Sequence, residues 1–217
     1  MQIVLFAKWP EAGKVKTRLS PIFDAEKCAD FAELLIQCTM NKIALSKFTD
    51  RKLAIWPPYC VERARNKFQI STIPQSAGDL GDKMADVIQL GINAGSPCVI
   101  LGCDVPHIDV GILNQAYDYL DSGNDVIGPT NDGGFYLIGL HRFDPVVFEN
   151  IVWGGNQVFN QVMRNYFSAF NDRIYTLPLV RDLDEPDDVR EVATTFEPIA
   201  CFLKSLAIGD LRNSSND

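Results

Sequence analysis

The sequence predicts an α/β domain with a mainly parallel but mixed β-sheet that is covered by helices. Through the first half of the chain, short apolar runs of strand length alternate with longer stretches of helical periodicity. This alternation is typical of parallel strands joined by helical crossovers. Two further expected strands, residues 135–140 and 173–179, lie near glycine or proline without regular helical crossovers, which indicates a mixed sheet.

Each expected element has its own signal. Buried strands are expected over residues 3–7, 53–56, 98–101 and 126–127, because each apolar run is followed by Gly, Pro or Lys. Asp24 suits the N-cap of a long helix whose apolar face recurs every three or four residues, at Cys28, Phe31, Ala32, Leu35, Cys38, Thr39 and Ile43. The same spacing predicts three more helices, from Met84, Val87, Ile88 and Ile92, from Leu113, Ala116, Tyr117 and Leu120, and from Val158, Val162, Met163 and Phe167.

The composition bounds the class of protein. With 217 residues, 47% of them hydrophobic and 22% charged, the chain is typical of a globular protein and not of a disordered or fibrous one. We expect one domain over residues 1–217, with a disordered tail from Asn213 to Asp217. The net charge of −8 argues against broad binding to nucleic acid or anionic membrane, and the apolar run 3–7 is too short for a signal or a membrane span.

The six cysteines do not form a zinc-binding pattern. They contain no C-x-x-C pair and have no histidine at zinc-finger spacing. Four of them stand in apolar stretches, where a free cysteine behaves as a small hydrophobic residue: Cys28, Cys38, Cys98 and Cys201. Buried thiols of this kind favour a reducing compartment, so we expect a cytoplasmic protein.

A basic loop follows the first expected strand. Residues 8–19, KWPEAGKVKTRL, hold four basic side chains and one acidic one. Such a loop at the carboxyl end of a strand can surround phosphates with ammonium, guanidinium and backbone N–H groups. It is not a Walker A loop, since Lys8 and Val15 stand where that motif needs Gly and Ser or Thr, and it is not a Rossmann fingerprint. The alternative is an ordinary solvated basic loop.

Asp104 emerges from the apolar run 98–101 in the segment LGCDVP. In open α/β sheets, ligands bind at this end of the strands, and a carboxylate there can hold Mg²⁺ or Mn²⁺ that bridges phosphate oxygens. The alternative is a turn or N-cap aspartate, a role for which Asp109 is better suited.

The segment IGPTNDGGFY, residues 127–136, allows two interpretations. Asp132 and Gly133 alone predict a hairpin turn. The paired glycines Gly133 and Gly134 also permit close approach of a ligand, with Asp132 contacting a hydroxyl or acting as a base. The sequence does not choose between them.

An acidic segment, residues 181–191, lies near the carboxyl end. Pro186 fits the first turn of a helix, and Asp187 and Asp188 fit its favourable dipole end. Asp182 and Asp184 precede that helix and share one side of an extended segment. Either could complete a metal site with Asp104.

Together, FAKWPEAGKVKTRL, LGCDVP, GPTNDGGFYLIGL and RDLDEPDDV resemble, in order and spacing, the glycosyltransferase-A-like nucleotide-diphospho-sugar transferase superfamily. The resemblance covers residues 1–195 and is strongest to a bacterial branch related to phospholactate guanylyltransferase and molybdenum cofactor guanylyltransferase. It implies a three-layer α/β/α fold, a divalent metal and bound nucleotide phosphates. Carried over by motif, the phosphates would meet Lys8, Gly13, Lys14, Lys16 and Arg18, and the metal would be held by Asp104 and, in preference to Asp182, by Asp184.

The sequence departs from the pattern of related nucleotidyltransferases in two places. They commonly open with a Leu-Ala-Gly-Gly-rich loop, which is replaced here by Phe-Ala-Lys-Trp-Pro, so base recognition stays unassigned. Trp153 is followed by Gly154 and Gly155 instead of the Ser-Thr found in this branch. Trp153 could stack on a sugar or base, with Gly133 and Gly134 beside the acceptor, or it could pack against the sheet.

The resemblance leaves the reaction open. In glycosyl transfer, which it favours, an acceptor attacks the sugar carbon of a nucleotide-diphospho-sugar, and a nucleoside diphosphate leaves. In nucleotidyl transfer, a phosphorylated acceptor attacks an NTP and pyrophosphate leaves. Lys16, Arg18 and Asp132 are the expected catalytic residues in either case. A third hypothesis is a nucleotide-binding regulator without catalysis.

Overall fold

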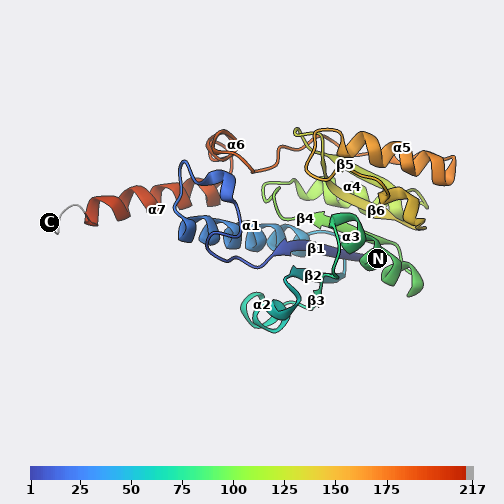
Figure 1. Ribbon diagram of the computed structural model, residues 1–217, viewed down its shortest axis with the longest axis horizontal. Helices are drawn as coiled ribbons and strands as arrows, with labels where there is room; N and C mark the ends of the chain where they lie inside the picture. Colours follow the sequence, from blue (N-terminus) through green and yellow to red (C-terminus); the bar gives the residue numbers. More distant parts are fainter. Residues whose placement is uncertain (214–217) are drawn as a thin grey trace.

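The computed structural model describes residues 1–213 and contains a seven-stranded mixed sheet in the order β3-β2-β1-β4-β6-β5-β7 (Figure 1). Neighbouring strands run parallel except for β6, which is antiparallel to both β4 and β5. The predicted mixed α/β sheet is therefore confirmed. Its strands are β1 (Gln2–Lys8), β2 (Asp50–Trp56), β3 (Thr72–Pro74), β4 (Cys98–Gly102), β5 (Val126–Pro129), β6 (Phe135–Leu140) and β7 (Tyr175–Thr176).

Helices cover both faces of this sheet. They are α1 (Ala25–Leu45), α2 (Val61–Phe68), α3 (Leu80–Asn93), α4 (Val110–Asp121), α5 (Val158–Phe170), α6 (Pro186–Val192) and α7 (Glu197–Asn213), with short 3-10 turns η1 (Thr17–Leu19), η2 (Pro58–Cys60) and η3 (Pro145–Phe148). Asp24 caps α1 and Asp109 caps α4, as predicted. Among the helices of residues 1–213, none combines the length and apolarity that a bilayer crossing needs.

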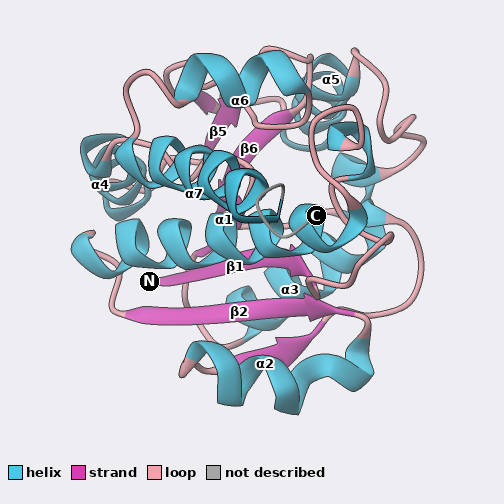
Figure 2. Cartoon of the chain, turned by 90° about the vertical axis from the view of Figure 1, so that its left-hand side faces the viewer, coloured by secondary structure: helices cyan, strands magenta, loops and turns pink. Residues whose placement is uncertain are grey.

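The alternation of side chains along β1 separates the two cores. Ile3 and Leu5 pack in a core with α1 and α4, whereas Val4 and Phe6 pack in a core with α3 and α5. All but Phe6 are 0% exposed, because a central parallel strand is buried on both faces. The result is the three-layer α/β/α arrangement that the resemblance implied, with α1 running along β1 (Figure 2).

A third, smaller core joins segments from both ends of the chain. Leu19 of η1 packs with Phe31 of α1, with Leu183 in the segment before α6, and with Ile199 of α7, all of them 0% exposed. This core holds the basic loop against the acidic segment.

Three expectations differ from the structure. Of the strand expected over residues 173–179, only Tyr175–Thr176 is a strand; the Leu177 N–H still donates to the Ile127 carbonyl, and the ladder ends at Pro178, which has no N–H. Cys201, expected to be buried, is exposed, whereas Cys28, Cys38 and Cys98 are buried free thiols. In the tail expected to be disordered, Asn213 ends α7 and residues 214–217 lie outside the described part of the chain.

Candidate active site

Two adjoining cavities lie at the carboxyl ends of β1 and β4, where an open α/β sheet places its ligands. The larger, of about 600 Å³, is called here the basic cavity, and its charged lining residues are Lys8, Lys14, Lys16, Arg18, Lys83, Asp104 and Asp184. The smaller, of about 260 Å³, is called the aspartate cavity, and its charged lining residues are Asp104, Asp132, Asp182 and Asp184. Asp104 and Asp184 line both cavities, so the two meet at this pair.

The basic loop begins with backbone contacts that set its direction. The Trp9 N–H donates to the Trp56 carbonyl at 2.7 Å, which extends the pairing of β1 with β2 past the end of β1. A turn follows in which Lys14 N–H donates to the Glu11 carbonyl at 3.0 Å and Gly13 adopts φ +76°. Gly13 lines neither cavity, so its role in the structure is to form the turn.

Lys16 is the most enclosed cation of the site, with its side chain only 8% exposed. Its Nζ lies 2.7 Å from Asp104 Oδ1, 2.9 Å from Asp184 Oδ1 and 2.7 Å from the Leu183 carbonyl oxygen. Its backbone has φ 48° and ψ 36°, a left-handed conformation that is uncommon for a residue with a side chain and costs about 1–2 kcal/mol. Backbone strain of this kind clusters at functional sites.

Lys16 and Asp184 are both held in their charged forms. Burial alone would lower the pKa of Lys16, but the charges of Asp104 and Asp184 outweigh it and raise that pKa. Burial alone would raise the pKa of Asp184, but Lys16, followed by Arg18, outweighs it and lowers that pKa. Arg18 gives Asp184 a second ion pair, from Arg18 Nη1 to Asp184 Oδ2 at 3.1 Å.

Leu183 connects the three chain segments that meet around the Lys16 ammonium group. Its backbone N–H donates to the Asp104 carbonyl at 2.9 Å, while its own carbonyl accepts from Lys16. Its side chain is buried in the small core with Leu19. The loop after β4, the basic loop and the acidic segment are therefore fixed to one another, and Asp184 reaches Lys16 although the two are 168 residues apart in sequence.

The oxygens around Lys16 suit a divalent cation. Two carboxylate oxygens and one backbone carbonyl oxygen converge on a single positive group, and hard oxygen ligands are those that Mg²⁺ and Mn²⁺ prefer. Within residues 1–213, no group of three or more His, Cys, Asp or Glu side chains is arranged to hold a metal. Mg²⁺ commonly uses only one or two carboxylates, with water and substrate phosphates as its other ligands, so Asp104 and Asp184 fit this role.

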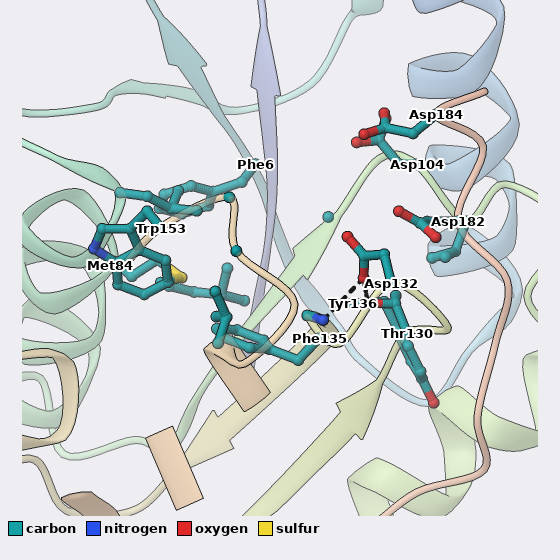
Figure 3. Close-up of a pocket in the computed structure, with 18 residues that line it drawn as sticks. Phe6, Met84, Asp104, Thr130, Asp132, Phe135, Tyr136, Trp153, Asp182 and Asp184 are labelled. Atoms are coloured by element: carbon teal, nitrogen blue, oxygen red, sulfur yellow. Dashed lines mark hydrogen bonds between the residues drawn. The ribbon is translucent and has the colours of Figure 1, made fainter. Parts of the chain in front are cut away.

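Asp132 lies in the turn between β5 and β6 and faces the aspartate cavity (Figure 3). Its Oδ1 accepts from the Thr130 hydroxyl at 2.6 Å and from the Gly134 N–H at 2.8 Å. Within residues 1–213 no hydrogen bond reaches its Oδ2. Asp132 belongs to a hairpin turn and also presents a carboxylate oxygen to the cavity, while its contact with a hydroxyl or its role as a base stays a prediction.

The two glycines after Asp132 have different places. Gly134 lines the aspartate cavity. Gly133 lines neither cavity and has φ +86°, and a Cβ there would collide with the Asn156 carbonyl oxygen. The structure therefore places Gly133 against backbone, whereas its contact with an acceptor stays a prediction.

Asp182, which spacing alone left equal to Asp184, makes no ion pair with Lys16 within residues 1–213. It lines the aspartate cavity and not the basic one. Burial, followed by the charges of Asp132, Asp184 and Asp104, raises the pKa of Asp182 to about 6. Of the two carboxylates, Asp184 is thus the one that shares a cation with Asp104.

The wall opposite the carboxylates in the aspartate cavity is apolar and includes Phe6, Met84, Phe135 and Trp153 (Figure 3). Trp153 also packs against α3, where a Cβ on Gly81 would lie 2.8 Å from Trp153 Cζ2. It therefore lines the cavity and packs in the interior at once. Phe6, Met84 and Phe135 carry no sequence signal of a cavity, because apolar residues at strand ends or on a helix face resemble ordinary core.

The basic cavity contains further residues that the sequence analysis missed. Lys83 of α3 places its Nζ 4.0 Å from the centre of the Trp56 ring, a cation–π contact. Gln75 is buried and donates from Nε2 to the carbonyls of Ala7 and Ala54 at 3.1 and 2.9 Å. Both lie after the basic loop in sequence and carry no motif that marks them, so only the fold brings them to the cavity.

Solved structures with a similar fold define the class of protein. A structure from Desulfovibrio desulfuricans G20, named "putative nucleotide-diphospho-sugar transferase", is 26% identical, with a TM-score of 0.86 over 94% of this chain and 95% of that one. CMP:2-keto-3-deoxy-manno-octonic acid synthetase complexed with CTP is 12% identical, with a TM-score of 0.54 over 94% and 98%. Rv0371C of Mycobacterium tuberculosis H37Rv complexed with manganese is 18% identical, with a TM-score of 0.50 over 90% and 100%. The protein has the nucleotide-diphospho-sugar transferase fold.

The particular family follows from the sequence. A family model described as "Uncharacterized protein conserved in bacteria (DUF2064)" matches residues 37–155, more than half of the chain. The chain belongs to this family. No curated protein sequence matches it significantly.

Proposed function

We propose that this protein is a metal-dependent transferase that moves a sugar from a nucleotide-diphospho-sugar to a small acceptor bearing a hydroxyl group. The observation that carries the proposal is the meeting of two unlike cavities at Asp104 and Asp184. A two-substrate transferase needs a donor site and an acceptor site that open onto the same reacting atoms. The basic cavity is the donor site in this proposal, and the aspartate cavity is the acceptor site.

On the donor side, the basic loop stabilises the negative charge that grows on the departing nucleoside diphosphate. Lys8, Lys14 and Arg18 line the cavity and can approach phosphate oxygens from one side, while Lys83 lies on another wall. Asp104 and Asp184 would hold Mg²⁺ or Mn²⁺, which when bound neutralises charge on the diphosphate leaving group. The manganese complex of Rv0371C, a protein of the same fold, supports a divalent cation in this role.

On the acceptor side, Asp132 is the proposed general base. The Thr130 hydroxyl and the Gly134 N–H hold its Oδ1, which fixes the carboxylate while Oδ2 remains available for a proton. The acceptor hydroxyl would give its proton to Oδ2 as its oxygen attacks the sugar carbon. The aromatic rings of Phe135 and Trp153 would pack against the flat face of the sugar or acceptor.

The charge of the aspartate cavity favours glycosyl transfer over nucleotidyl transfer. Nucleotidyl transfer to a phosphorylated acceptor would bring a phosphate into this cavity. Besides Asp104 and Asp184, which would hold the metal, its charged lining residues are Asp132 and Asp182, and no Lys, Arg or His within residues 1–213 lines it. Like charges brought together in an interface cost several kcal/mol, so a phosphorylated acceptor would be repelled where a neutral hydroxyl would not. The name of the Desulfovibrio protein supports the same reaction.

The experiment is a two-way product assay. Purified protein is incubated with Mg²⁺ or Mn²⁺ and either a panel of nucleotide sugars with small alcohols and sugars, or a panel of NTPs with phosphorylated sugars. Release of a nucleoside diphosphate from a nucleotide sugar supports the proposal, and release of pyrophosphate from an NTP replaces it with nucleotidyl transfer. Tight nucleotide binding without either product, retained in Asp104→Ala, would identify a nucleotide-binding regulator instead.

A further inference from the structure

Three oxygens surround the Lys16 ammonium group in the structure. An ammonium group carries three N–H bonds, and these oxygens belong to Asp104, Asp184 and the Leu183 carbonyl. The group lies in the wall of the basic cavity, but it donates hydrogen bonds to Asp184 Oδ1 and the Leu183 carbonyl and forms an ion pair with Asp104. Lys16 in this position therefore neutralises the two carboxylates.

We infer that the Lys16 ammonium occupies the position of the divalent cation, so that metal binding must displace Lys16, which then turns to the phosphates of the donor. The inference rests on the metal site of the proposed function. Without metal, Lys16 neutralises Asp104 and Asp184; with metal bound, it contacts the phosphates of the donor.

Electrostatic repulsion prevents the Lys16 ammonium and a divalent metal from occupying this site together. The Nζ of Lys16 lies within 2.9 Å of one oxygen from each carboxylate, so a metal that binds those same oxygens would lie beside the ammonium. A divalent and a monovalent cation repel each other strongly in a partly buried site, where water screens them poorly. Because the Lys16 side chain is only 8% exposed, water can screen little of this repulsion unless the side chain moves.

The surroundings give Lys16 a place to move. It lines the basic cavity with Lys14 and Arg18, so a donor diphosphate there would offer new acceptor oxygens to a released ammonium group. Metal binding to Asp184 would also weaken the ion pair of Arg18 with the other oxygen of that carboxylate, which leaves Arg18 more available to the diphosphate. Metal and diphosphate should therefore each favour the binding of the other, because each removes an obstacle to the other.

The first test is a titration with Mn²⁺ alone, followed by electron paramagnetic resonance of the free ion, on wild type, Lys16→Met and Lys14→Met. Lys16→Met keeps the length of the side chain and removes the competing charge, so we expect it to bind Mn²⁺ about tenfold more tightly than wild type. Lys14→Met is the matched control, since it removes the same charge from an exposed side chain of the same loop that pairs with Glu11. We expect its affinity to stay within about twofold of wild type.

The outcomes separate this inference from the proposed function. Equal or weaker Mn²⁺ binding by Lys16→Met, with clear binding by wild type, overturns the displacement of Lys16 and leaves the metal site intact. An equal gain in both variants also overturns it, because general charge would then be the cause. No Mn²⁺ binding to any of the three proteins overturns the metal site and the inference with it.

A second test uses only the wild-type protein, in case Lys16→Met does not fold. Lysines are acylated briefly in mildly alkaline buffer, and the labelling of Lys16 relative to Lys14 is measured by mass spectrometry with and without saturating Mg²⁺. The enclosed, paired ammonium should be protected without metal, and the ratio should rise at least about fivefold when Mg²⁺ is added. An unchanged ratio overturns the inference.

Discussion

The basic cavity and the aspartate cavity share the wall formed by Asp104 and Asp184, but their other charged residues have opposite signs. Five cations line the first, whereas the second adds only Asp132 and Asp182 to the shared pair. The loop after β1 supplies most of the cations, and the turn between β5 and β6 supplies Asp132. In the proposed function this difference separates two roles: the basic cavity stabilises phosphate charge, and the aspartate cavity accepts a proton from an uncharged nucleophile.

The largest expected effect comes from the shared wall. Asp104→Asn removes a charge that lines both cavities and that would bind the metal in the proposed function, so we expect the rate of nucleoside diphosphate release to fall at least about 10³-fold. The measurement is the same product assay, with the nucleotide sugar that gives the highest wild-type rate. Asp121→Asn, an exposed carboxylate at the end of α4, is the control and should retain wild-type activity. Near-normal activity of Asp104→Asn would contradict the shared role of the pair.

The next effect is confined to the aspartate cavity. In Asp132→Asn the amide oxygen can still accept from Thr130 and Gly134, but the side chain can no longer take a proton. We expect kcat to fall by about 10²–10³-fold, with little change in KM for the donor and in the melting temperature. A variant that instead raised the KM of the donor would place Asp132 on the donor side and remove the distinction between the cavities.

Alanine substitutions of two glycines near the aspartate cavity test how much a close backbone contact there contributes to stability. Gly133 and Gly154 both have positive φ, but a Cβ on Gly133 would collide with the Asn156 backbone, whereas a Cβ on Gly154 would meet nothing within 4 Å. We expect Gly133→Ala to lower the free energy of unfolding by about 2–3 kcal/mol, and Gly154→Ala by about 1 kcal/mol. Urea denaturation measures both. Equal effects would show that the contact with Asn156 contributes nothing.

The smallest effect is a dependence of stability on pH. Because the pKa of Asp182 is raised to about 6, above its unfolded value, the folded protein binds more protons between the two values and loses stability as pH rises through that window. Asp182→Asn, which never ionises, should therefore increase the free energy of unfolding by about 1 kcal/mol at about pH 7.5, after allowance for partial exposure, and change it little near pH 4.

Urea denaturation with a chelator present, at the two pH values, checks this last prediction. The chelator matters because a metal on Asp184 would change the charge around Asp182. A gain at pH 4 as large as that at pH 7.5 would mean that Asp182 affects stability through its shape and not through its charge.

The elements with strong local signals were predicted well, and the weak ones were not. The apolar run of residues 3–7 and the capped periodicity from Asp24 became β1 and α1 almost as expected. The three-residue strand β3 and the eight-residue helix α2 were missed, since both are short and α2 buries only Ala64 and Phe68, which leaves few apolar residues to mark it. These short elements owe their conformation to packing at the edge of the sheet.

The sequence by itself determined which chemical groups stand at the ends of strands. An apolar run that stops at Lys8 or Asp104 sets the strand boundary, because burial is favourable up to the charge and costly beyond it. Only the tertiary structure decided which of these groups meet. Lys16 reaches Asp184 because Leu19 and Leu183 share one small core, and periodicity along the chain carries no information about that contact. For the same reason Phe6 and Phe135 look like core in the sequence, while the fold leaves them as the wall of a cavity.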